Sequence, residues 1–249
     1  MNRLAPPPPM AAETLQSAVD WAISSRRSVR AFLPTPVSHA ELISILEVAR
    51  YAASGMNIQP WQVHVVTGAA KQRLSARMRA AFDDPQQMSA MDEPYAYYPR
   101  EWVEPYVGRR REVGYGLYGL LGIAKGDKQR MHEQHARNLQ FFDAPVGLFI
   151  TIDRLMERGS FIDCGMFMQS IMVAARARGL DTCPQAVFTT FHRLIAHELA
   201  ITDDQTFVCG MSLGHADPSR PENALVSDRI PVTSFTRFHH AAPAQDSMP

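Results

Sequence analysis

Arg26-Arg27-Ser28-Val29-Arg30 is the first of two stretches that decide the fold of this chain, and Ala53-Ser54-Gly55-Met56-Asn57-Ile58-Gln59-Pro60-Trp61 is the second. If the first stretch is extended, alternate side chains point to the same side, so Arg26, Ser28 and Arg30 would face one spot. Two guanidinium groups and a hydroxyl at one spot suit a phosphate, because arginine donates fork-like hydrogen bonds to phosphate oxygens. Taken alone, the first stretch also fits an ordinary basic turn.

The overall charge of the chain indicates that an anion would have to be bound at a local site. The sequence has 25 basic and 25 acidic side chains, and 22 of the basic ones are arginine against 3 lysines. A formal net charge of zero provides no long-range field to attract nucleic acid or an anionic membrane. A generic DNA-binding protein is therefore excluded, and any anion must be bound by a few side chains that converge.

Composition indicates a soluble globular protein. The 249 residues are 46% hydrophobic and 20% charged, which allows a sizeable core without a membrane or disordered composition. The three cysteines are far apart and form no Cys-x-x-Cys motif, so we predict no disulfide framework and no metal site. Residues 6–9 are four prolines, which interrupt the apolar run that a signal peptide needs. We expect a cytoplasmic protein with reduced thiols.

Periodicity predicts an α+β fold. Helical spacing of apolar residues, or a cap or stop signal, predicts helices over 14–24, 39–53, 69–81, 129–141, 161–178 and 190–199. Runs rich in β-branched and aromatic residues predict strands over 61–67, 146–152 and 207–213. We expect one domain over 13–240, flexible ends at 1–12 and 241–249, and an irregular excursion over 83–128 that is rich in proline and aromatics.

Three other motifs are weaker. Residues 114–119 read Gly-x-Gly-x-x-Gly, but no hydrophobic strand precedes them, so we do not predict a dinucleotide-binding turn. The run Arg109-Arg110-Arg111 fits a solvated surface, with recognition of a substrate carboxylate as the alternative. Cys183 has no electropositive partner placed beside it by the sequence, so we interpret it as a buried structural thiol.

Read together, the two opening stretches resemble the FMN-dependent nitroreductase family, including its nitrobenzoate-reducing members. Further landmarks follow in the family's order: Asp163-Cys164-Gly165, Cys183-Pro184-Gln185, Gly210 to Gly214, and Arg229-Ile230-Pro231. The resemblance implies a nitroreductase-like fold with a mixed central sheet flanked by helices. It also implies an interlocked homodimer with two FMN molecules at the interface.

The resemblance assigns roles to individual positions. It implies that Arg26, Ser28 and Arg229 of one subunit hold the FMN phosphate and ribityl chain, assisted by Arg27. It implies that Arg30 lies by the pyrimidine edge of the flavin, where a positive charge stabilises the reduced ring. It implies that the other subunit contributes Ala53, Ser54, Gly55 and Asn57, with Asp163 as a weaker candidate. Along the ring it implies Pro184, Gln185 and Ala186, and Gly214 completes the set of cofactor-binding positions.

Two positions depart from the family pattern. Ala53 stands where members often have proline, and Ser227 stands where some members have a lysine for the phosphate. The second departure would leave more of the phosphate charge to Arg26 and Arg229.

The implied activity is transfer of hydride from NADH or NADPH to FMN, followed by reduction of a nitroaromatic compound. This would be a ping-pong reaction in two-electron steps to nitroso and hydroxylamine products, with no catalytic side chain because flavin N5 carries the hydride. The excursion over 83–128 would be either a substrate lid or a packing surface. Reductive dehalogenation, enone or quinone reduction, flavin fragmentation and flavin binding without turnover remain as alternatives.

Overall fold

The computed structural model describes residues 12–239. The predicted flexible ends lie outside these residues, except for Ala12, which begins the first helix. The helices of four residues or more are α1 (Ala12–Ser24), α2 (His39–Ala49), α3 (Gly68–Asp83), α4 (Pro85–Ser89), α5 (Tyr106–Leu120), α6 (Lys128–Ala136), α7 (Arg158–Arg176) and α8 (His192–Leu199), with 3₁₀ segments η2 (Arg137–Asp143), η3 (Ala186–Thr189) and η4 (Pro221–Ala224). Two single 3₁₀ turns are η1 (Gly55–Asn57) and η5 (Val232–Ser234). No helix of the described part has both the length and the apolar character needed to cross a membrane.

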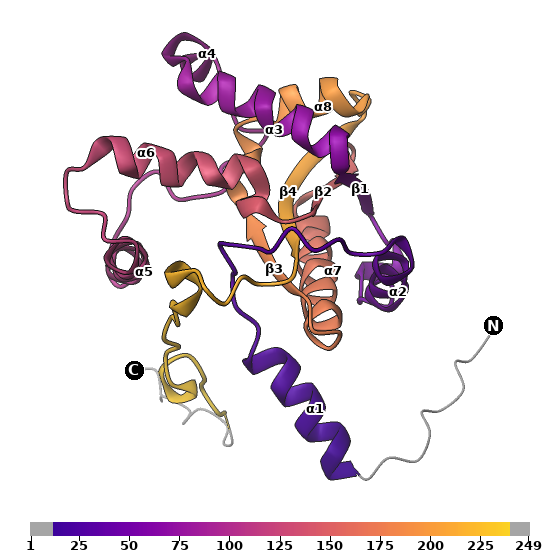
Figure 1. The fold of residues 1–249 in the computed structure, drawn as a ribbon. Helices are drawn as coiled ribbons and strands as arrows, with labels where there is room; N and C mark the ends of the chain where they lie inside the picture. The colour runs from indigo at the N-terminus through magenta and orange to yellow at the C-terminus, as the bar shows by residue number, and fades with distance from the viewer. Residues whose placement is uncertain (1–11, 240–249) are drawn as a thin grey trace, which may run out of the picture.

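Four strands form the central sheet, in the order β1-β2-β4-β3 (Figure 1). They are β1 (Trp61–Thr67), β2 (Val146–Asp153), β3 (Asp181–Gln185) and β4 (Gln205–Gly214), and each neighbouring pair is antiparallel. Within the described residues, the one parallel contact is the isolated bridge between Ser28 and Thr182 of the edge strand β3. We expected a mixed sheet. Within residues 12–239 the four strands are all antiparallel, and this one bridge is the parallel contact.

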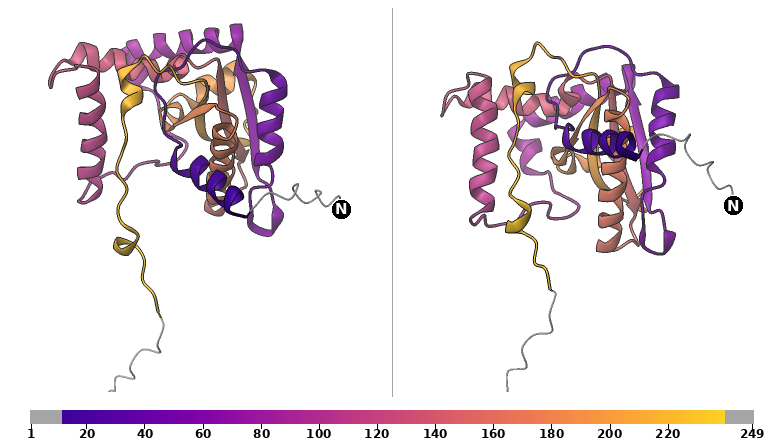
Figure 2. Two further views of the ribbon diagram at one scale, coloured as in Figure 1. Left: turned by 60° about the horizontal axis from the view of Figure 1, so that its bottom comes forward. Right: turned by 90° about the horizontal axis from the view of Figure 1, so that it is seen from below.

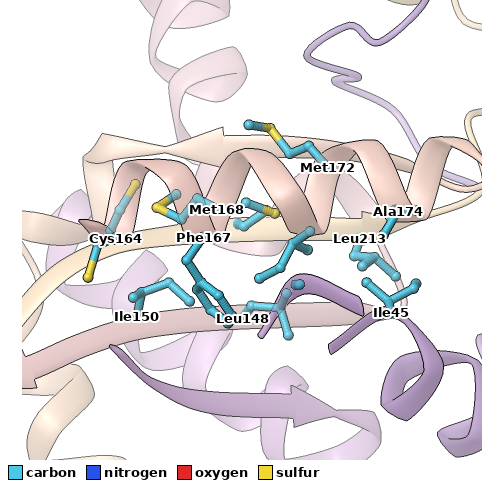
Figure 3. Close-up of a cluster of buried hydrophobic side chains, with 14 of the residues drawn as sticks. Ile45, Leu148, Ile150, Cys164, Phe167, Met168, Met172, Ala174 and Leu213 are labelled. Carbon is cyan, nitrogen blue, oxygen red and sulfur yellow. The ribbon is translucent and has the colours of Figure 1, made fainter. Parts of the chain in front are cut away.

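Helices cover both faces of the sheet, and each face has its own hydrophobic core. The core on one side joins α2 and α7 to β2 and β4, with Phe167 and Ile171 of α7 almost fully buried (Figure 3). The core on the other side joins α3, η2 and α8 to the sheet around Phe149 and Phe188. Because β2 is covered on both faces, seven of its eight residues are buried, as its continuous apolar sequence predicts.

Local signals explain where several elements begin and end. The Ser38 side chain accepts a hydrogen bond from the Glu41 backbone N–H, and the Glu41 carboxylate accepts one from the Ser38 backbone N–H. This reciprocal cap starts α2 at the predicted residue, although the helix ends four residues earlier than we expected, at Ala49. Gly179 follows α7 with φ of +74°, a left-handed conformation that favours glycine and stops the helix as predicted.

The sequence prediction was wrong for much of the excursion. Residues 106–120 form α5, a helix of 15 residues, and the Gly-x-Gly-x-x-Gly motif lies inside it. The motif therefore has no turn with which to bind a dinucleotide, as its context predicted. The helix stands beside the C-terminal segment in both views of Figure 2, and a Cβ at Gly116 would lie 3.0 Å from Leu225 Cδ1.

Strand β3 was also missed. It has only five residues and contains Pro184, which pairs with Met211 of β4. Proline is tolerated in a strand at the edge of a sheet, where its nitrogen does not have to donate to a neighbour. Its position brings Thr182 and Cys183 next to the extended segment that contains Ser28.

Candidate flavin site

A cavity of about 460 Å³ lies where the first and last parts of the described chain meet. Its lining combines the end of α1, the extended segment after it, one residue each from α5 and α7, and the C-terminal segment: Ile23, Ser24, Arg26, Arg27, Ser28, Arg30, Val113, Gln169, Leu225, Val226, Ser227 and Arg229. The structure thus brings together the four positions that we expected at the phosphate and ribityl chain, Arg26, Arg27, Ser28 and Arg229, and also Arg30, which we expected at the edge of the flavin ring.

The extended conformation of residues 26–30 orients these side chains. Val29 N–H donates to the Thr182 carbonyl over 3.1 Å, and Ser28 forms the bridge to the same strand. The Val29 side chain is 6% exposed and belongs to the core, whereas Arg26, Ser28 and Arg30 are half-buried and line the cavity. Val29 thus points into the core while Ser28 and Arg30 on either side of it point to the cavity, which is the alternation that the sequence predicts for an extended segment.

The cavity holds positive charge that the described residues do not neutralise. Burial lowers the pKa of Arg26, and the positive charge of Arg229 lowers it further, while Cys183 acts in the opposite direction. Within residues 12–239, no carboxylate forms an ion pair with Arg26, Arg27, Arg30 or Arg229. An anion placed between the half-buried Arg26 and the exposed Arg229 would stabilise both positive charges.

Arg229 keeps most of its hydrogen-bonding capacity free for such an anion. Its Nη1 donates to the Ser227 carbonyl, the Ser227 hydroxyl and the Asp228 carbonyl, all within 2.9 Å. Within the described part of the chain, Nε and Nη2 have no partner. Ser227 therefore orients Arg229 instead of supplying the positive charge that a lysine would bring.

A second group of predicted residues lies away from this cavity, at the surface of α7. Gly55 N–H donates to Asp163 Oδ1 over 3.2 Å, which ties the turn η1 to the first part of α7. Three residues close together, Met56, Asn57 and Gln59, have φ of 49°, 59° and 52°, the left-handed region that side chains other than glycine rarely adopt. Such local strain is often found at binding sites, and Met56 is 96% exposed.

The same turn is anchored from its other end. Trp61, which begins β1, stacks on Phe167 of α7 with 4.6 Å between ring centroids. The Ser54 hydroxyl accepts a hydrogen bond from Gln59 N–H over 3.0 Å, which closes the loop on itself. Ala53, Gly55 and Asn57 remain exposed, so this group presents a rigid surface that no part of the described chain covers.

The third predicted group, residues 184–186, consists of the last two residues of β3 and the first of η3, and its members are buried to different degrees. Gln185 is 3% exposed, its Nε2 donates to the Asn138 carbonyl over 2.9 Å, and its Oε1 accepts from Ser212. Its side chain therefore holds β3 against η2, while Pro184 and Ala186 on either side are partly exposed. Asn138, which the sequence analysis did not select, has a role here that only the contact reveals.

Gly214 has a packing reason for being glycine. A Cβ at this position would lie 2.6 Å from Pro145 Cδ, so a larger residue would displace the loop before β2. It lies in β4 opposite Asp181 and does not line the cavity. The cavity lining includes one residue that the sequence analysis missed and for which a signal existed: Gln169 is a polar position inside the apolar helix α7.

The three thiols do not offer a nucleophile. Burial raises the pKa of Cys183 to about 11, although the positive charges of Arg30 and Arg26 and a hydrogen bond from Ser28 act in the opposite direction. Burial also raises the pKa of Cys164 to about 12 and that of Cys209 to about 11. The thiolate is the reactive form, so all three are inert at neutral pH.

Comparison with known proteins agrees with this geometry. The model of the nitroreductase family matches residues 23–215, which include the cavity-lining arginines of the first segment, η1 and all four strands. The chain belongs to the nitroreductase family. The resemblance inferred from the two opening stretches is confirmed.

Relatives of this nitroreductase-family chain reduce nitroaromatic compounds according to their names. It is 44% identical to a 4-nitrobenzoate reductase of Pseudomonas putida over 219 residues, which cover 88% of this chain and 94% of the relative. It is 40% identical to a nitrobenzene nitroreductase of Ectopseudomonas oleovorans over 222 residues, covering 89% and 97%.

Solved structures confirm the nitroreductase-like fold. The FMN- and NADPH-dependent nitroreductase NfnB from Sphigopyxis sp. strain HMH superposes with a TM-score of 0.86 at 36% identity, covering 90% of this chain and 99% of that one. The FMN-dependent nitroreductase NfnB from Mycobacterium smegmatis in complex with NADPH superposes with a TM-score of 0.85 at 29% identity, covering 91% and 100%. The α+β class that the sequence predicts is therefore correct.

Proposed function

We propose that this chain binds FMN and uses NADH or NADPH to reduce nitroaromatic compounds. The observation that carries the proposal is the cavity that Arg26 and Arg229 both line and to which the described residues contribute no carboxylate. Its donor set fits a phosphate monoester: guanidinium groups from two segments and the hydroxyls of Ser28 and Ser227. The names of the relatives support FMN as the phosphorylated ligand and a nitroaromatic compound as the acceptor.

We propose that a second copy of this chain completes the site. Residues 53–57 and Asp163 do not line the cavity of their own chain, and Met56 next to them is almost fully exposed. Large apolar side chains are exposed on α1 and on α7, where Val19 is 54%, Trp21 49% and Ile162 69% exposed. Apolar surface of this extent favours association, and a homodimer would bring residues 53–57 of one subunit to the cavity of the other.

FMN, when bound, would accept a hydride from NAD(P)H and transfer it to the nitro compound, so the protein needs no nucleophile of its own. Its residues have three tasks in this scheme. Arg26, Arg229 and Arg27 hold the phosphate, while the positive charge of Arg30 stabilises negative charge on the reduced cofactor. The turn at residues 54–57 offers backbone groups and small side chains against which a planar group can lie. The reaction would be ping-pong, with nitroso and hydroxylamine products.

The aromatic part of the excursion is a candidate for the surface that covers the acceptor. Tyr97 and Tyr98 contact each other edge to face, with 4.7 Å between ring centroids, and Tyr98 is 57% exposed. Tyr95 fastens this cluster to the core because its hydroxyl donates to the Val208 carbonyl. A cluster that is anchored at one end and exposed at the other can exclude water from a bound aromatic compound.

An anaerobic stopped-flow experiment tests the proposal. The purified protein should be yellow and release FMN on denaturation, NADH or NADPH should bleach the bound flavin, and a nitroarene should restore its colour. Restoration only by a halogenated aromatic, an enone or a quinone would assign another reaction to the same site. Bound flavin that neither pyridine nucleotide reduces would identify a flavin-binding protein without turnover. A protein that takes up no FMN would overturn the proposal.

A further inference from the structure

The arginines of the cavity come from two segments, and their positive charges repel each other across it. Arg26 and Arg30 lie in the extended segment after α1, and Arg229 lies in the C-terminal segment. The effect of Arg229 on the pKa of Arg26 shows that their like charges interact. Before an anion is bound, the two segments must therefore be held together by contacts that do not involve the arginine side chains.

Backbone pairing holds the two segments together only up to residue 217. Leu33 N–H donates to the His215 carbonyl over 2.8 Å, and Asp217 N–H donates to the Ala31 carbonyl over 3.0 Å. The described structure has no backbone hydrogen bond between these two segments after Asp217. Twelve positions separate Asp217 from Arg229, so this ladder alone does not set the position of the Arg229 guanidinium.

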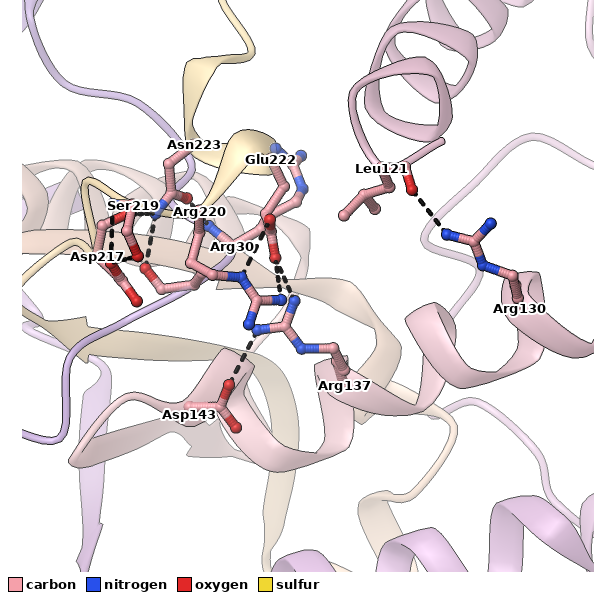
Figure 4. A network of polar contacts seen from close by, with 11 residues as sticks. Arg30, Leu121, Arg130, Arg137, Asp143, Asp217, Ser219, Arg220, Glu222 and Asn223 are labelled. Carbon is pink, nitrogen blue, oxygen red and sulfur yellow. Dashed lines mark hydrogen bonds and ion pairs between the residues drawn. The ribbon is translucent and has the colours of Figure 1, made fainter. Parts of the chain in front are cut away.

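Beyond these backbone hydrogen bonds, the Asn223 side chain links the two segments. Its Oδ1 accepts a hydrogen bond from Arg30 N–H over 2.9 Å, and its Nδ2 donates to the Ala31 carbonyl over 2.8 Å and to the Asp217 carbonyl over 2.9 Å. Figure 4 shows Asn223 reaching from η4 toward Asp217 and Arg30. One amide group therefore ties both segments together, six positions before Arg229 and at the backbone of Arg30.

The chemistry of these contacts requires an amide. The backbone N–H of Arg30 needs an acceptor, and the two carbonyls need a donor, which only the carboxamide of asparagine or glutamine offers at once. A carboxylate would keep the first contact but would place negative charge against the carbonyls of Ala31 and Asp217. Alanine would lose all three hydrogen bonds and leave these backbone groups to find water.

The neighbouring residue anchors the same turn from its other side. The Glu222 side chain is fully buried and accepts hydrogen bonds from Arg137 of η2 and from Arg220, the latter over 2.9 Å. Arg137 also pairs with Asp143 over 2.9 Å. The turn that presents Asn223 is thus attached to the body of the protein, so Asn223 has a rigid support against which to position residues 30–31 (Figure 4).

We propose that Asn223 is the residue that positions the phosphate-binding arginines of the two segments relative to each other. Asn223 is not itself part of the cavity lining and touches no reacting group. It holds the backbone at Arg30 and Ala31, in the segment that carries Arg26, against the segment that leads to Arg229, and is therefore a positioning residue. This inference rests on the proposed function, because it takes the anion in the cavity to be the phosphate of FMN. Asn223 should therefore matter for a flavin that has a phosphate and not for one that lacks it.

The test compares FMN with riboflavin, which lacks the phosphate, by fluorescence titration of the apoprotein. Asn223→Ala should weaken FMN binding by about tenfold, which corresponds to about 1.4 kcal/mol at 25 °C, and leave riboflavin binding within about twofold. Asn223→Asp keeps the shape of the side chain and should show the same selective loss. The matched control is Ser219→Ala, just before the same turn. Within the described residues the Ser219 hydroxyl hydrogen-bonds only to Asp217, so this variant should leave both affinities unchanged.

Equal weakening of both flavins, or no change in either, would overturn the inference. If both Asn223 variants fail to fold, as judged by circular dichroism of the apoprotein, the residue is structural and the inference is wrong as well. A wild-type protein that binds neither flavin would instead refute the proposed function. The two failures are therefore distinguishable in one set of titrations.

Discussion

Two arginine clusters border the C-terminal segment, and they differ in what faces the guanidinium groups. In one, Arg137 and Arg220 enclose the buried carboxylate of Glu222. In the other, Arg26 and Arg229 share a cavity in which the described residues provide no carboxylate. The positive charges of the first cluster are paired with a carboxylate of the same chain and stabilise the fold, whereas those of the second would be paired by the anion of a bound ligand. Removing a charge should therefore lower stability in the first cluster and ligand affinity in the second.

Glu222→Ala should produce the largest effect on stability. It leaves Arg137, which is only 17% exposed, with one carboxylate in place of two. Breaking a buried ion pair from one side costs about 3 kcal/mol, so the apoprotein should unfold at a clearly lower urea concentration at fixed protein concentration. Glu133→Ala is the control, because its carboxylate pairs with Arg79 at the surface and should matter far less. Equal destabilisation by the two variants would contradict the distinction.

Arg26→Ala should act on the ligand and not on the fold. Loss of one charge-assisted contact to phosphate should weaken FMN binding by about 100-fold, or about 2.7 kcal/mol, and leave riboflavin nearly unaffected. The melting temperature of the apoprotein should stay the same or rise, because the variant removes the repulsion between Arg26 and Arg229. Arg193→Ala, at an exposed pair with Asp92, is the control. Unchanged FMN affinity would show that the phosphate lies elsewhere.

The acid dependence of stability separates the clusters further, with a smaller effect. Burial alone would raise the pKa of Glu222, but hydrogen bonds from Arg220 and Arg137 outweigh it and hold the pKa below its ordinary value of 4.5. A carboxyl group with a lowered folded pKa stabilises the protein above its unfolded pKa, and this contribution is lost as pH falls through the folded value. The stability advantage of wild type over Glu222→Gln should therefore be constant above about pH 5.5 and shrink below pH 4.5. A constant difference down to pH 3 would refute this assignment.

Cys183→Ser should have the smallest effect on function, although Cys183 lies next to the arginine cavity. With its pKa raised to about 11, the thiol is protonated at neutral pH and cannot act as a nucleophile. Turnover of NAD(P)H with a nitroarene should stay within about twofold of wild type, measured at saturating FMN, because the proposed chemistry resides on the cofactor. A loss of several hundredfold with the fold intact would assign a catalytic role to the thiol.

The sequence predicted the elements in which local pattern and final environment agree. Strand β2 reads as a continuous apolar run because both faces of the sheet are covered, and α7 combines an apolar face with Gly179 at its end. The capping box at Ser38 starts α2 at the predicted position because its hydrogen bonds involve only neighbouring residues. Signals of this kind are complete within a few positions of the chain.

The sequence failed where tertiary packing outweighs local preference. Helix α5 contains four glycines and no buried residue, so it has neither high helix propensity nor an apolar periodicity to detect. At Gly116 the small residue allows close approach of Leu225, a contact between segments more than 100 positions apart. Strand β3 was hidden by Pro184, whose position at the sheet edge is a property of the fold and not of the local sequence.

For the site, the sequence determined which side chains are present, and alternation in residues 26–30 determined that Arg26, Ser28 and Arg30 face one way. Only the tertiary structure decided that Arg229 joins them and that Asn223 links their segments, because these contacts span about 200 positions. It also decided that Glu222 completes one pair of arginines and leaves the other open. Charge is a property of the sequence, but whether a charge is neutralised depends on which distant residue the fold places against it.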